Sequence, residues 1–180
     1  WMFGTPLEQM WGKKKFIFFY LSAGLGAALI QTLVYHYDVI SVSKILIDNG
    51  LTNLDVDTFY ETGRLNTGII QSVGEERLYS GIQSFKAVMV GASGALYGIL
   101  VGFAMLFPNV QLMLLFPPIP IKAKYFVPGI LAVDLFLGFK GSSLFGSGGT
   151  GIAHFAHVGG MIFGFILIKY WQKTDRKHFY

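Results

Sequence analysis

The chain has 180 residues, of which 53% are hydrophobic and only 13% are charged, and its formal net charge is +4 at pH 7. Soluble domains contain about 25% charged residues, so this sequence has too little polar surface for a globule in water. We therefore discard an unusually apolar soluble α/β domain. The absence of cysteine excludes disulfides and thiolate metal sites. The composition is that of an integral membrane protein.

The first segment, residues 1–12, has the pattern of a helix that begins further upstream. It starts with Trp1 and not with methionine, and Pro6, Glu8 and Gly12 stop the helical pattern. We expect the end of an earlier helix followed by a cytoplasmic turn. On this interpretation the chain is a fragment that lacks its N-terminal part.

Four later stretches are candidates for transmembrane helices, each of which needs about 20 apolar residues. Residues 16–36, 87–107 and 151–169 are apolar over roughly that length. The fourth stretch, residues 125–139, is shorter and is interrupted by a proline and an aspartate. We expect an all-α polytopic membrane protein, a helix bundle with about four transmembrane spans.

The basic residues lie next to these spans and indicate an orientation. Lys13 to Lys15 precede the first span, Lys122 and Lys124 precede the weak one, and further basic residues lie in the tail 170–180. Under the positive-inside rule both chain ends face the cytoplasm, and the segment 37–86 forms an outer loop. This placement favours a bacterial cytoplasmic membrane and argues against nucleic acid as a partner.

The outer loop 37–86 contains most of the polar sequence. Residues 41–51 have the amphipathic spacing of a short helix that lies in the membrane interface. Because loops of this length are usually functional or disordered, we expect a cap that rests on the outer membrane face.

The sequence "VGASGALYG", residues 90–98, places a serine among small residues. On a helix, Gly94, Gly98 and Gly102 form one stripe, the pattern that lets a second helix backbone approach closely. Ser93 lies beside this stripe, with Tyr97 one turn further on. Taken alone, the pattern more often belongs to a packing helix whose serine bonds to its own preceding turn.

The last expected span carries two histidines one turn apart, His154 and His157, and its Gly160 and Gly164 share a face with His157. A histidine inside a membrane is functional by default. Two small-residue faces packed together would bring an imidazole within hydrogen-bond reach of the Ser93 hydroxyl, so that it acts as general base. The alternative is that each histidine bonds only a backbone carbonyl.

Other hydrolytic designs find little support in the sequence. There is no H-E-x-x-H zinc motif, and two histidines without a nearby carboxylate make a poor metal site. Asp134 is the one acid in an expected span, so a paired-aspartate mechanism lacks its second member, and we expect Asp134 to be a packing residue. With no acid expected near either histidine, the prediction is a Ser-His dyad, with no metal and no cofactor.

The sequence "GASGALYG" (residues 91–98), followed later by "AHVGG" (residues 156–160), resembles the rhomboid family of intramembrane serine proteases. These carry G-x-S-G at the start of one helix and A-H-x-x-G on the last. Residues 1–27 also resemble the end of the family's second helix, its cytoplasmic turn and its third helix. The resemblance therefore covers nearly the whole chain.

The resemblance implies that Ser93 is the nucleophile and His157 the general base, in a serine helix that begins below the outer surface. His154 falls outside the family's catalytic position and is assigned to packing or cavity lining. The other implied roles are support of the active site and oxyanion by Gly91, Ala92, Gly94 and Tyr97, and helix packing by Gly98, Gly102, Gly160 and Gly164.

We therefore expect an intramembrane serine endopeptidase that cleaves transmembrane protein substrates in the lipid bilayer. The family's H-x-x-x-N pair, which binds the oxyanion, is absent here, so the fragment alone should be inactive. One alternative is a rhomboid-like pseudoprotease that binds membrane clients without cleaving them, and another is a small transporter or channel subunit. The sequence does not indicate an oligomeric state.

Overall fold

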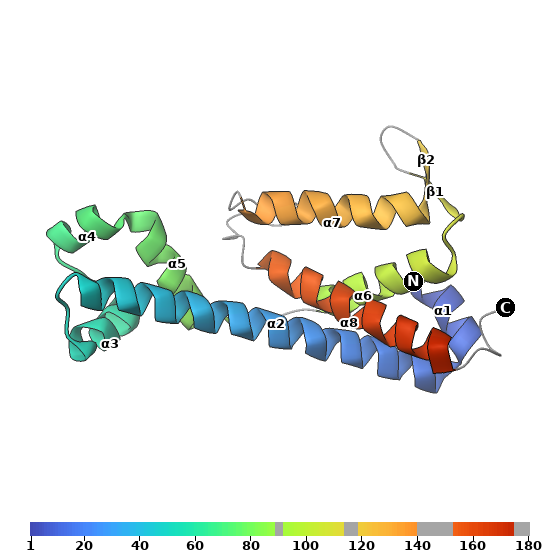
Figure 1. Cartoon of the computed structure of the whole chain (residues 1–180), viewed down its shortest axis with the longest axis horizontal. Coiled ribbons are helices and arrows are strands. Elements are labelled where there is room, and N and C mark those ends of the chain that lie inside the picture. Colours follow the sequence, from blue (N-terminus) through green and yellow to red (C-terminus); the bar gives the residue numbers. More distant parts are fainter. Residues whose placement is uncertain (89–91, 114–118, 140–152, 175–180) are drawn as a thin grey trace. The chain divides into compact units, whose positions relative to one another are not determined.

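The computed structural model describes residues 1–88, 92–113, 119–139 and 153–174. In these residues eight helices and one short hairpin follow one another (Figure 1). The expected helical fold is confirmed, and the hairpin is a departure from it. The elements in chain order are α1 (Gly4–Trp11), α2 (Lys13–Asp48), α3 (Asn53–Thr62), α4 (Thr67–Val73), α5 (Glu75–Lys86), α6 (Ser93–Leu106), β1 (Gln111–Met113), β2 (Pro120–Lys122), α7 (Ala123–Phe139) and α8 (Ala153–Thr174).

The hairpin lies between α6 and α7 and consists of β1 and β2. The two strands are antiparallel, and Leu112 faces Ile121 in the register. Each strand has three residues, which is too short for the alternation of polar and apolar residues that reveals a strand in a sequence.

The chain forms two compact units, which we describe separately. Unit 1 contains residues 1–31 and 90–180, and unit 2 contains residues 32–89. Helix α2 contributes its first part to unit 1 and its second part to unit 2.

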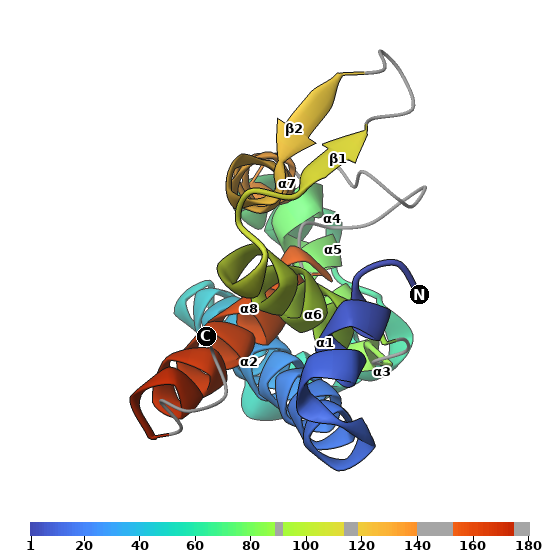
Figure 2. The same ribbon diagram turned by 90° about the vertical axis from the view of Figure 1, so that its right-hand side faces the viewer.

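In unit 1, α6 packs along α8, and α7 lies beside both (Figures 1 and 2). The contact between α6 and α8 is made by backbone against backbone. A Cβ atom built on Gly160 would lie 1.8 Å from the carbonyl oxygen of Gly94, and one on Gly164 would lie 3.0 Å from the Cα of Gly98. Only glycine is compatible with the first of these distances.

Helix α2 presents a row of large apolar side chains outward from unit 1. Ile17, Leu21, Leu25 and Leu29 are spaced one turn apart and are between 53% and 73% exposed. A continuous exposed apolar face of this kind marks contact with a membrane or a partner. Among the described residues, α2 is the one helix both long and apolar enough to cross a bilayer, and α6 is a shorter apolar helix.

The helices differ from the expected spans mainly at their ends. Helix α2 extends well past residue 36, because the sequence contains no proline between Lys13 and the turn at Gly50, where φ is +91°. The short interfacial helix expected at residues 41–51 is wrong as a separate element, since most of it forms the last turns of α2. Helix α6 begins at Ser93 and has 14 residues, which corresponds to about 21 Å.

Residues 37–86, the expected outer loop, form helices around a core of their own. The second part of α2 packs against α3 and α5, and α4 lies between these in the chain. The buried members of this core are Val42, Leu46, Val56, Phe59, Tyr60 and Leu78.

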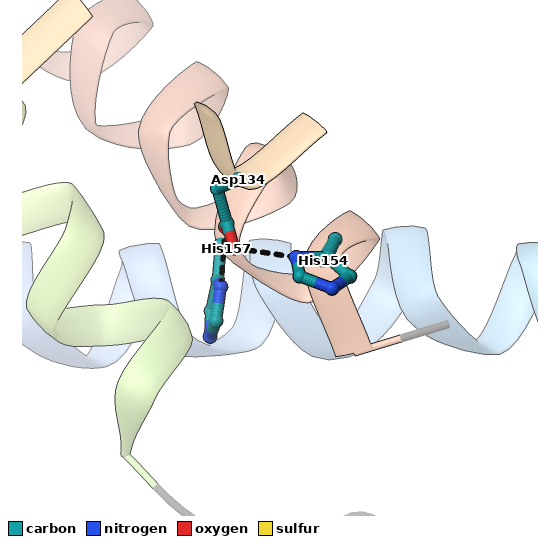
Figure 3. Close-up of side chains that lie close together, drawn as sticks. All are labelled: Asp134, His154 and His157. Carbon is teal, nitrogen blue, oxygen red and sulfur yellow. Dashed lines mark hydrogen bonds and ion pairs between the residues drawn. The ribbon is translucent and has the colours of Figure 1, made fainter. Parts of the chain in front are cut away.

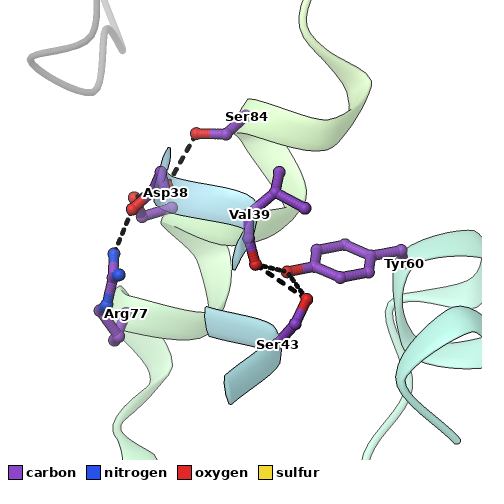
Figure 4. A network of polar contacts seen from close by, with 7 residues as sticks. Asp38, Val39, Ser43, Tyr60, Arg77 and Ser84 are labelled. Carbon is purple, nitrogen blue, oxygen red and sulfur yellow. Dashed lines mark hydrogen bonds and ion pairs between the residues drawn. The ribbon is translucent and has the colours of Figure 1, made fainter. Parts of the chain in front are cut away.

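A polar network ties the helices of unit 2 together (Figure 4). Asp38 on α2 pairs with Arg77 and accepts hydrogen bonds from the hydroxyls of Ser80 and Ser84, both at 2.7 Å, and all three partners are on α5. On the other side, the Tyr60 hydroxyl donates to the carbonyl oxygen of Val39 at 2.9 Å. Each polar side chain of this network thus has a partner on another helix.

Candidate active site

Ser93 is the first residue of α6, and its side chain is exposed. Ala92 precedes it at the N-cap position and is also exposed, whereas Gly91 lies outside the described residues. Within the described part of the chain, the Ser93 hydroxyl has no hydrogen-bond partner. The backbone N–H groups of the first turn of a helix have no partner within the helix, so the serine lies beside donors that α6 itself does not satisfy.

Tyr97 lies one turn after Ser93 and stacks on the ring of His157. The two ring centroids are 4.1 Å apart, and the ring planes differ by 4°. Because residues i and i+4 share one face of a helix, Ser93 lies on the α6 face that carries this stacked pair.

The glycine contact sets the height of α8 relative to α6. A Cβ atom on Gly94, the residue after Ser93, would lie 3.0 Å from the carbonyl oxygen of Ala156, the residue before His157. The first turn of α6 therefore lies beside the turn of α8 that carries His157. No hydrogen bond between Ser93 and His157 is present among the described residues, and such contacts often tighten only when a substrate binds.

Asp134 joins both histidines, which corrects the expectation that no acid lies near them. Its carboxyl group is 1% exposed, with Oδ2 lying 2.6 Å from Nδ1 of His157 and Oδ1 pairing with Nδ1 of His154 (Figure 3). The reason is tertiary: α7 and α8 are packed side by side and run in opposite directions (Figure 1), which brings together residues 20 and 23 positions apart.

The position of this acid beside the histidines was not predicted from the sequence, although a signal for a functional acid was present. A carboxylate within an apolar stretch is functional by default, and Asp134 is the one acid of that kind. His154, assigned to packing or cavity lining, is 3% exposed and bonded to Asp134, so it belongs to the same cluster.

The three side chains offer ligand atoms that all lie within 4.8 Å of one another, which raises the question of a metal ion. Two ligands of a tetrahedral zinc ion, each at about 2.0 Å from the metal, lie about 3.3 Å apart. The 2.6 Å between Nδ1 of His157 and Oδ2 of Asp134 is instead a hydrogen-bond distance. The geometry therefore fits a carboxylate held by two imidazoles.

Comparison with protein families gives one clear result. The family model described as the Rhomboid domain matches residues 1–46 and 56–173, which together make up most of the chain. Comparisons with curated proteins and with solved structures give no match.

Proposed function

The chain belongs to the rhomboid family, a family of membrane serine proteases, and we propose that it is an intramembrane serine endopeptidase acting on transmembrane segments of other proteins. The observation that carries this proposal is the stack of Tyr97 on His157, one helical turn from an exposed serine at the start of α6.

In the proposed reaction, Nε2 of His157 takes the proton of the Ser93 hydroxyl as Oγ attacks the scissile carbonyl carbon. The free N–H groups of the first turn of α6 donate to the resulting oxyanion, and loss of one such donor typically costs about 10²–10³ in rate. His157 then gives the proton to the leaving amine, the C–N bond breaks, and an acyl ester remains on Ser93. Water, deprotonated by His157, hydrolyses that ester.

The proposed site lies in a helix bundle with spans near residues 16–36, 87–107, 125–139 and 151–169, in a bacterial cytoplasmic membrane with both ends of the chain inside. The short α6 supports this arrangement, because about 21 Å does not cross a hydrocarbon core of about 30 Å. A helix of this length can begin within the membrane, where a substrate helix would meet it.

The second candidate function is a pseudoprotease that binds membrane clients without cleaving them. The observation that favours it is the absence, among the described residues, of a hydrogen bond between Ser93 and His157. Such a protein would keep the fold and the client-binding surface but would have no activated serine.

Labelling with a fluorophosphonate probe distinguishes the two. We expect the full-length protein in detergent to be labelled, and the Ser93→Ala and His157→Ala variants to show no labelling while they elute as folded protein. A folded, unlabelled wild type would overturn the protease proposal and support client binding.

A further inference from the structure

We propose that Asp134 is a positioning residue of the active site, which holds His157 in the tautomer that can accept the serine proton, and that His154 holds Asp134 in turn. This inference rests on the proposed function, because it assigns how the general base is oriented. It extends the expected dyad of Ser93 and His157 to four side chains by adding Asp134 and His154. These side chains come from α6, α7 and α8.

The hydrogen bonds to Asp134 determine which nitrogen of each imidazole carries a proton. A carboxylate can only accept hydrogen bonds, and both of its oxygens face an imidazole Nδ1. Each imidazole must therefore carry its proton on Nδ1. In neutral His157 this leaves Nε2 without a proton, as an acceptor, which is the state that a general base requires.

The second step concerns the orientation of the ring. Asp134 bonds one edge of His157, and Tyr97 covers one face with nearly parallel ring planes. The phenol of Tyr97 also lies near the Asp134 carboxylate. A ring held at one edge and one face keeps its remaining edge in a constant direction, away from Asp134 (Figure 3).

His154 holds the Asp134 carboxylate in place. The ring centroids of His154 and His157 are 6.2 Å apart, and their ring planes differ by 86°. His154 therefore acts on His157 through the shared carboxylate. By occupying Oδ1, it keeps the carboxylate from turning about its Cβ–Cγ bond and so leaves Oδ2 for His157. His154 is 3% exposed and His157 is 14% exposed, so the second histidine has the better access to a substrate.

The fourth step concerns the charge that forms during the reaction. When His157 takes the serine proton it becomes a cation inside a mostly apolar bundle. A carboxylate at hydrogen-bond distance stabilises that cation where water cannot. The groups that face His157 from the packed helices are Asp134 on α7, His154 on its own helix and Tyr97 on α6, and Asp134 is the one carboxyl group among them.

The test is a comparison of Asp134→Asn with the wild type in the full-length protein, using a cleavable transmembrane substrate and the fluorophosphonate probe. The amide can donate to Nδ1 and so favour a proton on Nε2, the wrong tautomer for a base. We expect kcat to fall by about 10²–10⁴ at neutral pH, with KM changed less than threefold, and probe labelling to slow in proportion. His154→Gln should lose less, by about 10-fold.

The matched control is Val127→Ala, at a buried residue of α7 in the apolar cluster that also contains Met161 on α8. It should lower the thermal midpoint through lost packing while kcat stays within about twofold of the wild type. If Asp134→Asn behaves like this control, with lower stability and unchanged kcat, Asp134 only packs the helices and the inference is wrong. In that case the labelled wild type still supports the protease.

A second measurement decides the matter if Asp134→Asn does not fold. Imidazole nitrogen NMR of the wild-type protein with labelled histidine should show His157 with its proton on Nδ1 and a strongly deshielded proton signal. A proton on Nε2 of the resting His157 would overturn the inference without bearing on whether Ser93 is the nucleophile.

Discussion

Each unit contains one aspartate that joins helices, and the two differ in their partners. Asp38 in unit 2 pairs with Arg77, which always carries a charge, and with two serine hydroxyls. Asp134 in unit 1 pairs with two imidazoles, whose ring nitrogens can both donate and accept a proton. The first set of partners suits an anchor that never changes state, and the second suits a group that takes part in proton transfer.

The two units also differ in how their helices pack. Unit 2 is held by a core of apolar side chains such as Val42 and Phe59. In unit 1, α6 and α8 meet through glycines, with backbone atoms in contact. Small residues let two helix backbones approach closely, and this approach occurs where the proposed serine and histidine must meet.

The largest expected effect comes from a methyl group added to each kind of contact. Gly160→Ala would place a Cβ atom 1.8 Å from the Gly94 carbonyl oxygen, which only a backbone shift relieves. We expect loss of probe labelling and a large drop in the thermal midpoint.

The matched change in unit 2 is Gly81→Ala, whose new Cβ atom would meet the side chain of Val42 at 2.9 Å. It should cost about 1–3 kcal/mol and leave labelling intact. Equal loss of labelling in both variants would show that the glycine contact has no special role.

The next effect separates the two aspartates. Asp38→Asn removes the charge that pairs with Arg77 and should destabilise the protein by about 1–3 kcal/mol, measured by thermal unfolding in detergent. Because its partners do not take part in proton transfer, kcat should stay near the wild-type value. A fall in kcat as large as that expected for Asp134→Asn would erase the distinction between the units.

A smaller effect is expected for two tyrosines. Tyr60→Phe in unit 2 removes the hydrogen bond to the Val39 carbonyl and should cost about 1 kcal/mol of stability. Tyr97→Phe keeps the stacked ring, so kcat should fall less than threefold, whereas Tyr97→Leu loses the stack and should lower kcat about 10-fold. Rates of substrate cleavage measure the effect of both Tyr97 variants. A larger loss of kcat for Tyr97→Phe than for Tyr97→Leu would contradict a role of the stacked ring.

The smallest effect concerns pH and the N-terminus of α3. The hydroxyl and the backbone N–H of Thr52 donate to the Asp55 carboxylate and lower the pKa of that exposed group. A carboxyl with a lower pKa in the folded state adds stability above its unfolded pKa of about 3.9, and this is lost as the pH falls through the folded value.

The thermal midpoint of unit 2 should therefore decrease slightly below about pH 4, and Asp55→Asn should weaken that decrease. Unfolding scans between pH 3 and 6 measure it. An unchanged pH profile in Asp55→Asn would show that other carboxyl groups cause the decrease.

The spacing of small residues in the sequence predicts much of the helix packing in unit 1. Gly94, Gly98, Gly160 and Gly164 follow a local rule, so the close contact of two helices could be expected from the sequence. The pairing of Asp134 with the histidines could not, because it depends on which residues of α7 and α8 face each other. Three residues per strand were also too few to reveal the hairpin.

Unit 2 was interpreted as a loop because its polar residues were counted without regard to their faces. Asp38 and Arg77 are polar, yet they point at each other between helices. Polar residues paired in this way look like loop residues in the sequence, and only the tertiary structure reveals that they lie between helices.

The glycine contact between α6 and α8 also restricts how this protein can change over evolutionary time. Every substitution of a glycine adds atoms, so at Gly160 no smaller residue is available and no single neighbouring change can restore the lost space. The side-chain core of unit 2 can drift instead, since a larger residue at one position can be offset by a smaller one at the next. We therefore expect homologous sequences to diverge faster in residues 32–89 than along the face shared by the two glycine-bearing helices.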